Sequence, residues 1–366
     1  MKPRSPVQPT ATELALWRQR EAELDRSGMR AHVAEFGSRL EAAVAPARSF
    51  ARGLDPDPTP AAIAVLGMGG SAVAGDLVAA AVGSRARLPV ATVRSPEPPA
   101  WIDDSAFVIA SSYSGDTEET LAAYRAARER GARGAVITTG GRIATLAAEL
   151  GDPVLELPSG LPPRAALPES LAGCALVVAA IAPGLEVAAL AEELRAAAGT
   201  LRPDLEAWLG WESTNSALAL AVSFADRLPI VYGGHPVSIA AAGRWKTQLN
   251  ENGKIPAWAG AFPEHGHNEI VGFDGGHPAL ERLALVYLET PWDDARVAHR
   301  MAWTRQWCAD RVGAQHRVET GGDTPLEGML RLCCMGDCAS FLVSIITGKD
   351  PTPVTPIDML KAELAR

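Results

Sequence analysis

Cysteine is scarce in this chain of 366 residues, and its five cysteines are an odd number. Three of them lie in the stretch CCMGDC at residues 333–338, inside one predicted helix. This stretch has no distant partner cluster, as a zinc site would need, and an odd count does not suit a disulfide framework. We therefore expect reduced thiols and a cytoplasmic protein.

Long apolar runs and an excess of positive charge are also missing. We expect no run of about 18 apolar residues in the chain, and hence no membrane span. The first residues, MKPRSPVQPTATELALW, lack the apolar core of a signal peptide. The net charge of −9 argues against nucleic acid and anionic membranes as partners. With 47% hydrophobic and 21% charged residues, the composition is that of a globular protein, and the length suits two domains.

Apolar segments that alternate with helical ones predict an α/β fold. Alternation of this kind gives parallel sheets with helices on both faces. The Pro-rich linker at 55–60 and Pro183-Gly184 suggest domain limits. We expect an N-terminal helical segment (1–55), a first domain (56–183) and a second domain with a C-terminal helix (184–366). The predicted strands are 61–66, 89–93, 107–110, 134–138 and 154–157, then 228–232, 283–288 and 315–319.

The first predicted strand runs into a glycine-rich turn, Gly67 to Ala72, with the sequence GMGGSA. It matches G-x-G-x-x-A, the relaxed form of the dinucleotide-binding fingerprint. However, the second strand ends in Val-Arg-Ser at 93–95 and offers no acidic residue for a ribose hydroxyl. No Lys-Ser/Thr pair follows the glycines, so the turn is not a P-loop. A nucleotide enzyme remains a rival interpretation, and Gly69, Gly70 and Ser71 could equally line a sugar.

The stretch FVIASSYSGDTEET at 107–120 passes from a strand through a hydroxyl-rich turn into a helix. Ser112, Ser114 and Thr117 place three hydroxyls where the unpaired N–H groups of a helix N-terminus also lie. Gly115 lets the backbone approach a ligand closely. The alternative is a helix-capping box, in which Ser, Asp or Thr is followed three residues later by Glu. Three hydroxyls and a glycine directly after a buried strand favour phosphate binding.

Later segments carry groups suited to acid–base chemistry. Glu251 lies between two asparagines in NENGKIPA, and His267 follows in FPEHGHNEIVGF. A carboxylate and an imidazole are the side chains that most often act as base and acid in catalysis. The pair His265 and His267 also permits a metal interpretation, although no other histidine cluster exists. Arg164 follows a stiff proline loop and could stabilise an oxyanion, or it could be a surface arginine. Lys361, on the C-terminal helix, is predicted to be a surface residue.

These motifs together resemble one family. GMGGSAVAGDL, SSYSGDTEETL, ITTGG, LPPRAAL, NENGKIPA, FPEHGHNEIVGF and PIDMLKAEL occur in this order over about residues 60 to 366. They are similar to the bifunctional phosphoglucose/phosphomannose isomerases of the sugar isomerase (SIS) superfamily. The resemblance implies two SIS subdomains, each a flavodoxin-like three-layer sandwich, in a homodimer with shared active sites. It implies no cofactor and no metal.

The resemblance also implies roles for residues. Ser71, Ser112, Ser114 and Thr117 would hold the phosphate and its neighbouring sugar atoms. Glu251 would be the base that moves a proton between C1 and C2, and Arg164 would stabilise the enediolate. His267 of the partner subunit and Lys361 would assist ring opening. Asp116 departs from the expected asparagine; a carboxylate near a phosphate is unfavourable, so we expect it to point away.

The predicted function is therefore metal-independent interconversion of glucose 6-phosphate and mannose 6-phosphate with fructose 6-phosphate. One alternative is a non-catalytic SIS module that senses a sugar phosphate, which would need no base such as Glu251. Another is an isomerase that retains only one of the two activities.

Overall fold

The fold is that of a computed structural model, which describes residues 8–364. By its internal contacts the chain divides into two compact units. One comprises Glu35–Arg202 and Gly322–Leu330, and is called here the first-sheet unit. The other comprises the remaining described residues, 8–34, 203–321 and 331–364, and is called the second-sheet unit. This division differs from the limits expected from the sequence, 1–55, 56–183 and 184–366, which stay a prediction of the domain boundaries.

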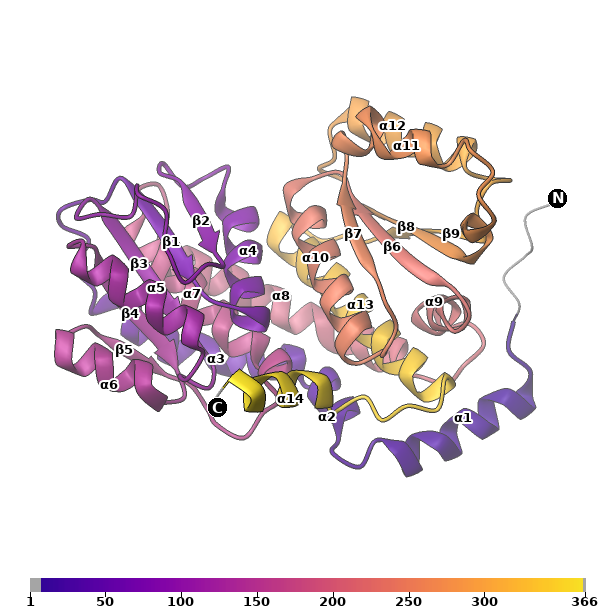
Figure 1. Cartoon of the computed structure of the whole chain (residues 1–366), viewed down its shortest axis with the longest axis horizontal. Helices are drawn as coiled ribbons and strands as arrows, with labels where there is room; N and C mark the ends of the chain where they lie inside the picture. The colour runs from indigo at the N-terminus through magenta and orange to yellow at the C-terminus, as the bar shows by residue number, and fades with distance from the viewer. Residues whose placement is uncertain (1–7, 365–366) are drawn as a thin grey trace. The chain divides into compact units, whose positions relative to one another are not determined.

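The first-sheet unit contains five parallel strands in the order β2-β1-β3-β4-β5 (Figure 1). Strands β1 and β3 are buried almost throughout, as expected for central parallel strands with continuous apolar sequences. The strands are β1 (Ala62–Leu66), β2 (Val90–Val93), β3 (Ala106–Ser111), β4 (Arg133–Thr138) and β5 (Val154–Glu156).

Helices cover both faces of this first sheet. Tyr124 of α5 and Ile143 of α6 pack with Val108 of β3 in one core cluster. On the opposite face, Gly75 of α4 approaches Val65 of β1, and Gly173 of α7 approaches side chains of β4 and β5. Helix α3 packs against α7. The result is a three-layer sandwich, as predicted. The helices are α3 (Phe36–Arg52), α4 (Gly69–Val82), α5 (Glu118–Glu129), α6 (Gly141–Leu150), η1 (Pro163–Ala166), α7 (Leu167–Ile181) and α8 (Val187–Trp208).

The second-sheet unit has four parallel strands in the order β7-β6-β8-β9 (Figure 1). Three of them were predicted; β7 was missed, because its sequence WAGA is short, partly exposed and free of apolar alternation. Tyr232 of β6, Tyr287 of β8 and Met301 of α12 share a core with Phe262 and Phe273. The strands are β6 (Leu228–Gly233), β7 (Trp258–Ala261), β8 (Leu283–Glu289) and β9 (Ala314–Glu319).

Helices α10 and α13 pack together in this unit through buried polar contacts. Arg244 of α10 makes two hydrogen bonds to Asp337 of α13, at 3.0 and 2.9 Å. The indole N–H of Trp245 donates to the Leu332 carbonyl at 2.7 Å. The remaining helices are α1 (Ala11–Leu24), α2 (Met29–Ala34), α9 (Ser216–Phe224), α10 (Pro236–Glu251), η2 (Glu264–His267), α11 (Glu269–Gly272), η3 (Pro278–Arg282), α12 (Ala295–Trp307), α13 (Pro325–Ile346) and α14 (Thr355–Leu364).

Two helical stretches, Pro163–Ile181 and Pro325–Ile346, are long and apolar enough to cross a membrane by length and composition alone. The expectation that the sequence holds no such stretch was therefore wrong. In both, 89% of the most apolar window is buried inside the protein. Burial explains the composition, because a helix surrounded by protein is apolar on every side.

The cysteines are free thiols, and all five are buried. Burial raises the pKa of the thiols of Cys333, Cys334 and Cys338. Thiols with a raised pKa are poor nucleophiles and poor metal ligands. The described part of the chain, residues 8–364, contains no group of three or more His, Cys, Asp or Glu side chains placed to hold a metal ion.

Candidate functional site

The glycine-rich turn connects β1 to α4 at the carboxyl end of the strand. A Cβ on Gly70 would lie 3.2 Å from the Pro163 carbonyl oxygen and 3.4 Å from Cα of Arg164. Gly70 therefore permits the loop that carries Arg164 to lie against the start of α4. Gly69 adopts φ +51°, in the left-handed region that favours glycine. Ser71 is buried in the first turn of α4.

The hydroxyl-rich loop connects β3 to α5 beside this turn. Thr117 is the N-cap of α5, yet within residues 8–364 its side chain makes no capping hydrogen bond. Instead its Oγ1 accepts a hydrogen bond from the Ser112 hydroxyl at 3.1 Å. Ser112 is buried and Ser114 is exposed. The capping-box alternative therefore does not describe Thr117, and the start of α5 keeps the N–H groups that attract an anion.

Gly115 locks the loop against the turn that follows β4. Its φ is +74°, and a Cβ there would lie 1.8 Å from the Gly140 carbonyl oxygen, so no other residue fits without a backbone shift. The backbone N–H of Ile143 donates to the Gly115 carbonyl at 2.9 Å. The sequence suggested that Gly115 serves close approach to a ligand; here it serves close approach of two loops.

The Asp116 side chain is hydrogen-bonded to the first turn of the neighbouring helix, α6. Its carboxylate accepts hydrogen bonds from the backbone N–H of Arg142 at 3.0 Å and from Arg142 Nε at 3.3 Å. The Arg142 guanidinium also donates to the Asp116 carbonyl at 2.9 Å. The carboxylate thus faces the first turn of α6, where the helix dipole and the guanidinium stabilise its charge.

Arg164 is 3% exposed in η1, which argues against a surface arginine. The preceding loop is held by Tyr113, whose hydroxyl donates to the Pro158 carbonyl and accepts from the Leu161 N–H, both at 2.9 Å. Tyr113 lies between Ser112 and Ser114, so one side chain connects the hydroxyl-rich loop to the arginine loop. Tyr113 was not among the residues predicted for the site, because a lone tyrosine among serines is the only sign of it in the sequence.

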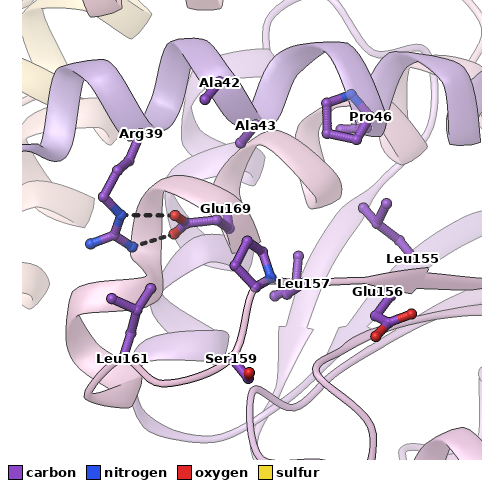
Figure 2. A pocket seen from close by; sticks show the side chains of 12 residues that line it. Arg39, Ala42, Ala43, Pro46, Leu155, Glu156, Leu157, Ser159, Leu161 and Glu169 are labelled. Atoms are coloured by element: carbon purple, nitrogen blue, oxygen red, sulfur yellow. Dashed lines mark hydrogen bonds and ion pairs between the residues drawn. The ribbon is translucent and has the colours of Figure 1, made fainter.

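A pocket of about 320 Å³ lies beside this arginine loop (Figure 2). Arg39 of α3 and Glu169 of α7 form an ion pair in it, with N–O distances of 2.9 and 2.6 Å. Figure 2 shows mostly apolar side chains around this pair. Among the described residues that line the pocket, no predicted site residue occurs. It is therefore a different feature from the candidate site.

In the second-sheet unit, Glu251 is the last residue of α10 and is half-buried. The asparagines on either side fix the backbone. Asn250 Oδ1 accepts from the Ala257 N–H at 3.2 Å, and Asn252 Nδ2 donates to Ser340 Oγ of α13 at 3.2 Å. The Asn-Glu-Asn pattern thus has a structural explanation: the asparagines anchor the end of the helix on which Glu251 lies.

Buried charge lies two helical turns before Glu251. Burial by itself lowers the pKa of the Arg244 guanidinium, but the Asp337 carboxylate and, more weakly, Glu251 outweigh it and hold this pKa above its usual value. Arg244 therefore stays charged in the interior of this unit.

The two histidines of FPEHGH have different environments. His265 is fully buried, stacked on Phe262 at 4.6 Å between ring centroids and edge-on to Tyr232 at 4.8 Å. Burial lowers its pKa, and neither ring nitrogen has a hydrogen-bond partner among the described residues. His267 is exposed. His265 is thus a core aromatic ring, and the interpretation of the pair as joint metal ligands was wrong.

The second-sheet unit repeats the strand–glycine turn–helix arrangement at β6 and α10, but its helix start is capped by its own side chains. Ser238 Oγ accepts from the N–H groups of Gly234 and His235, at 3.1 and 3.0 Å. His235 Nδ1 accepts from the Val237 N–H at 3.4 Å. These N–H donors are used within the turn itself, so this helix start has fewer of them left for an anion than the start of α5.

The structure thus gathers the predicted residues into two sets. Residues for phosphate and oxyanion, namely Gly69, Gly70, Ser71, Ser112, Ser114, Thr117 and Arg164, belong to the first-sheet unit. The predicted base, Glu251, and the residues predicted to assist ring opening, His267 and Lys361, belong to the second-sheet unit. Lys361 lies on α14 and is exposed.

Comparison with known proteins shows the family to which the chain belongs. Residues 213–364 match the model of the bacterial phosphoglucose isomerase C-terminal SIS domain. A bifunctional phosphoglucose/phosphomannose isomerase of Caldicellulosiruptor bescii is 36% identical over 303 residues, covering 83% of this chain and 89% of that protein. The chain belongs to the bifunctional phosphoglucose/phosphomannose isomerase family. The resemblance read from the sequence is confirmed.

Further relatives of this family member extend the match. A protein of the same name from Thermoplasma acidophilum is 29% identical over 340 residues, covering 92% of this chain and all of that protein. Among solved structures, a hypothetical protein from Thermus thermophilus superposes with a TM-score of 0.72 over 97% of this chain and 94% of its own, at 16% identity. That likeness concerns the fold alone.

Proposed function

We propose that the protein is an aldose–ketose isomerase that interconverts glucose 6-phosphate and mannose 6-phosphate with fructose 6-phosphate. The observation that carries the proposal is the start of α5 in a chain of this family. There the Ser112 hydroxyl bonds to Thr117, and the Thr117 side chain does not cap the N–H groups of the helix. A helix start with free donors and hydroxyls suits a dianionic phosphate.

Other residues of the first-sheet unit add contacts to the substrate. Ser71 and Ser114 add donors to the phosphate and the adjoining sugar, while Gly69 and Gly70 let the backbone approach. Phosphate binding remote from the reacting carbons positions the sugar for reaction. We assign no metal and no cofactor to the reaction.

Glu251 takes the proton from C2 of the aldose and returns it to C1, while the proton on O2 moves to O1, so that aldose and ketose are isomers. The intermediate enediolate carries negative charge on oxygen, which Arg164 stabilises. His267 and Lys361 assist opening of the sugar ring before this step. His267 comes from the partner subunit of a homodimer, so both subunits contribute to each site. We place the enzyme in the cytoplasm, without a nucleic-acid or membrane partner.

Both isomerase activities should occur in one site without a metal. Removal of the C2 proton gives a planar enediolate, in which the configuration that distinguishes glucose from mannose is lost. Rotation about C2–C3, with the phosphate held in place, would let Glu251 reprotonate either face. The test measures both isomerase rates on one preparation treated with chelator, and both should persist. An isomerase of one activity would leave one aldose phosphate unconverted; a rate that requires added zinc would contradict the metal-free mechanism.

Loss of any one loop hydroxyl should weaken the substrate's phosphate contact. A hydrogen bond to a charged group contributes roughly 1.5–3 kcal/mol. Each of Ser112→Ala, Ser114→Ala and Thr117→Ala should therefore lower kcat/KM by about tenfold or more. Ser38→Ala provides the control, because this exposed serine of α3 donates only to the Glu35 carbonyl. Wild-type kinetics in all three loop variants would place the phosphate elsewhere.

A further inference from the structure

Lys254 has an unusual backbone conformation. It adopts φ +55°, and within residues 8–364 it is the only residue other than glycine with positive φ. A side chain with a Cβ pays a steric penalty in this region, and such strain persists only where other interactions over-determine it. A glycine at position 254 would adopt this conformation at less cost, so we infer that the lysine side chain itself has a use there.

The side chain explains the strain. Lys254 Nζ donates to three backbone carbonyls, those of Glu251, Pro351 and Pro353, with a distance of 3.1 Å to Pro351. An ammonium group has three N–H donors and no acceptor, so each donor has a carbonyl. Glu251 ends α10, and its carbonyl is one of those that a helix end leaves without a partner in the helix. A cation there also interacts favourably with the helix dipole.

The three carbonyls come from two parts of the chain that both carry predicted site residues. The Glu251 carbonyl belongs to the residue assigned as the base. Pro351 and Pro353 directly precede α14, which begins at Thr355 and carries Lys361. One ammonium group therefore joins the end of α10 to the start of α14, inside the second-sheet unit.

Other contacts also fix the end of α10. Asn252 joins it to α13 through Ser340, and Asn250 closes the loop onto Ala257. The segment before α14 also contains prolines, which supply carbonyl acceptors but no N–H donors of their own.

We propose that Lys254 is a positioning residue that sets the place of α14, and so of Lys361, relative to Glu251. The expected effect on turnover rests on the proposed function, whereas the connection that Lys254 makes between α10 and α14 does not depend on it. Lys254 touches no reacting atom in this scheme; it acts through the two residues whose segments it joins. The left-handed backbone of Lys254 directs the ammonium group to the three carbonyls.

The test compares Lys254→Met, Lys254→Gly and the control Lys246→Met. Methionine keeps the side-chain length and the backbone strain but removes the donors, while glycine removes both strain and donors. Lys246 is an exposed lysine on the same helix, α10. Hydrogen exchange of a peptide that covers residues 355–364 should lose protection in both Lys254 variants and stay unchanged in Lys246→Met. This readout is independent of activity.

Turnover should fall by about ten- to hundredfold in both Lys254 variants, the size expected when reacting groups are misplaced rather than removed. Inhibition by inorganic phosphate should be unchanged, because the phosphate loop belongs to the other unit. In a Lys361→Ala background, Lys254→Met should cost less than in the wild type, since coupled residues are not additive. Wild-type turnover in Lys254→Gly would overturn the proposal, because the lost donors would then be irrelevant.

Failure of this inference can be separated from failure of the proposed function. Unchanged exchange of residues 355–364 in both Lys254 variants would overturn the positioning role, whatever the activity of other variants. If exchange increases while Glu251→Gln remains active, the connection made by Lys254 is supported as structure, and the assignment of the base is at fault.

Discussion

Replacement of Glu251 by glutamine should reduce turnover of glucose 6-phosphate and mannose 6-phosphate by at least about a hundredfold. Glutamine keeps the shape of the side chain but cannot accept the C2 proton. Asn250 and Asn252 anchor the surrounding backbone through partners of their own, so the end of α10 should keep its fold. Both activities should fall together, because one base serves both epimers.

The measurement is kcat for each aldose phosphate, with binding assessed separately. A ligand that binds only the folded state raises its melting temperature, so a sugar-phosphate inhibitor should still stabilise Glu251→Gln. Glu281→Gln, an exposed carboxylate of the same unit, provides the matched control and should remain fully active. Normal turnover in Glu251→Gln would remove this residue from the mechanism, and loss of inhibitor binding would indicate a structural role instead.

Much of the fold could be predicted from local patterns in the sequence. The buried runs in β1 and β3 and the glycine turns after them follow from rules that involve only neighbouring residues. The hydroxyl-rich loop was also predictable, because strand, turn and helix start are contiguous in the chain. Strand β7 was not, since WAGA owes its conformation to pairing with β6 rather than to its own composition.

Side chains whose partners are distant in sequence were harder to predict. Tyr113 connects two loops through Pro158 and Leu161, more than 40 residues away. Lys254 bonds to carbonyls almost 100 residues further on. His265 and His267 are two residues apart, yet one is buried among aromatic rings and the other is exposed. The short 3-10 helix η2 turns them to different sides, which the His-x-His spacing does not reveal.

The apolar helices give a related lesson about composition. Residues 325–346 have the length and hydropathy of a membrane span, and the same residues pack against α10 through Arg244 and Asp337. Hydropathy alone measures how little a segment favours water; it does not distinguish lipid from protein as the surroundings. Asp337 of this helix forms its ion pair with Arg244 of α10 inside the protein, where a buried charge needs an oppositely charged partner.

A mixture of two inactive variants should regain activity if the sites are shared between subunits. Glu251→Gln and His267→Ala chains, each purified as inactive protein, are mixed in equal amounts and allowed to exchange subunits. In a two-fold dimer each interface element occurs twice. A mixed dimer then has one site with both residues intact and one site with neither.

With random exchange, half of the dimers are mixed, so about a quarter of all sites should be restored. This recovery, from at most roughly one hundredth of wild-type turnover, is large enough to measure directly. Subunit exchange is verified by mass spectrometry of the mixture, and Glu251→Gln mixed with itself is the control. If exchange occurs and activity stays absent, Glu251 and His267 act from the same chain, and the partner's His267 has no part in the site. In that case His267, which is exposed in the single chain, would have to reach a substrate bound in its own subunit in order to assist ring opening.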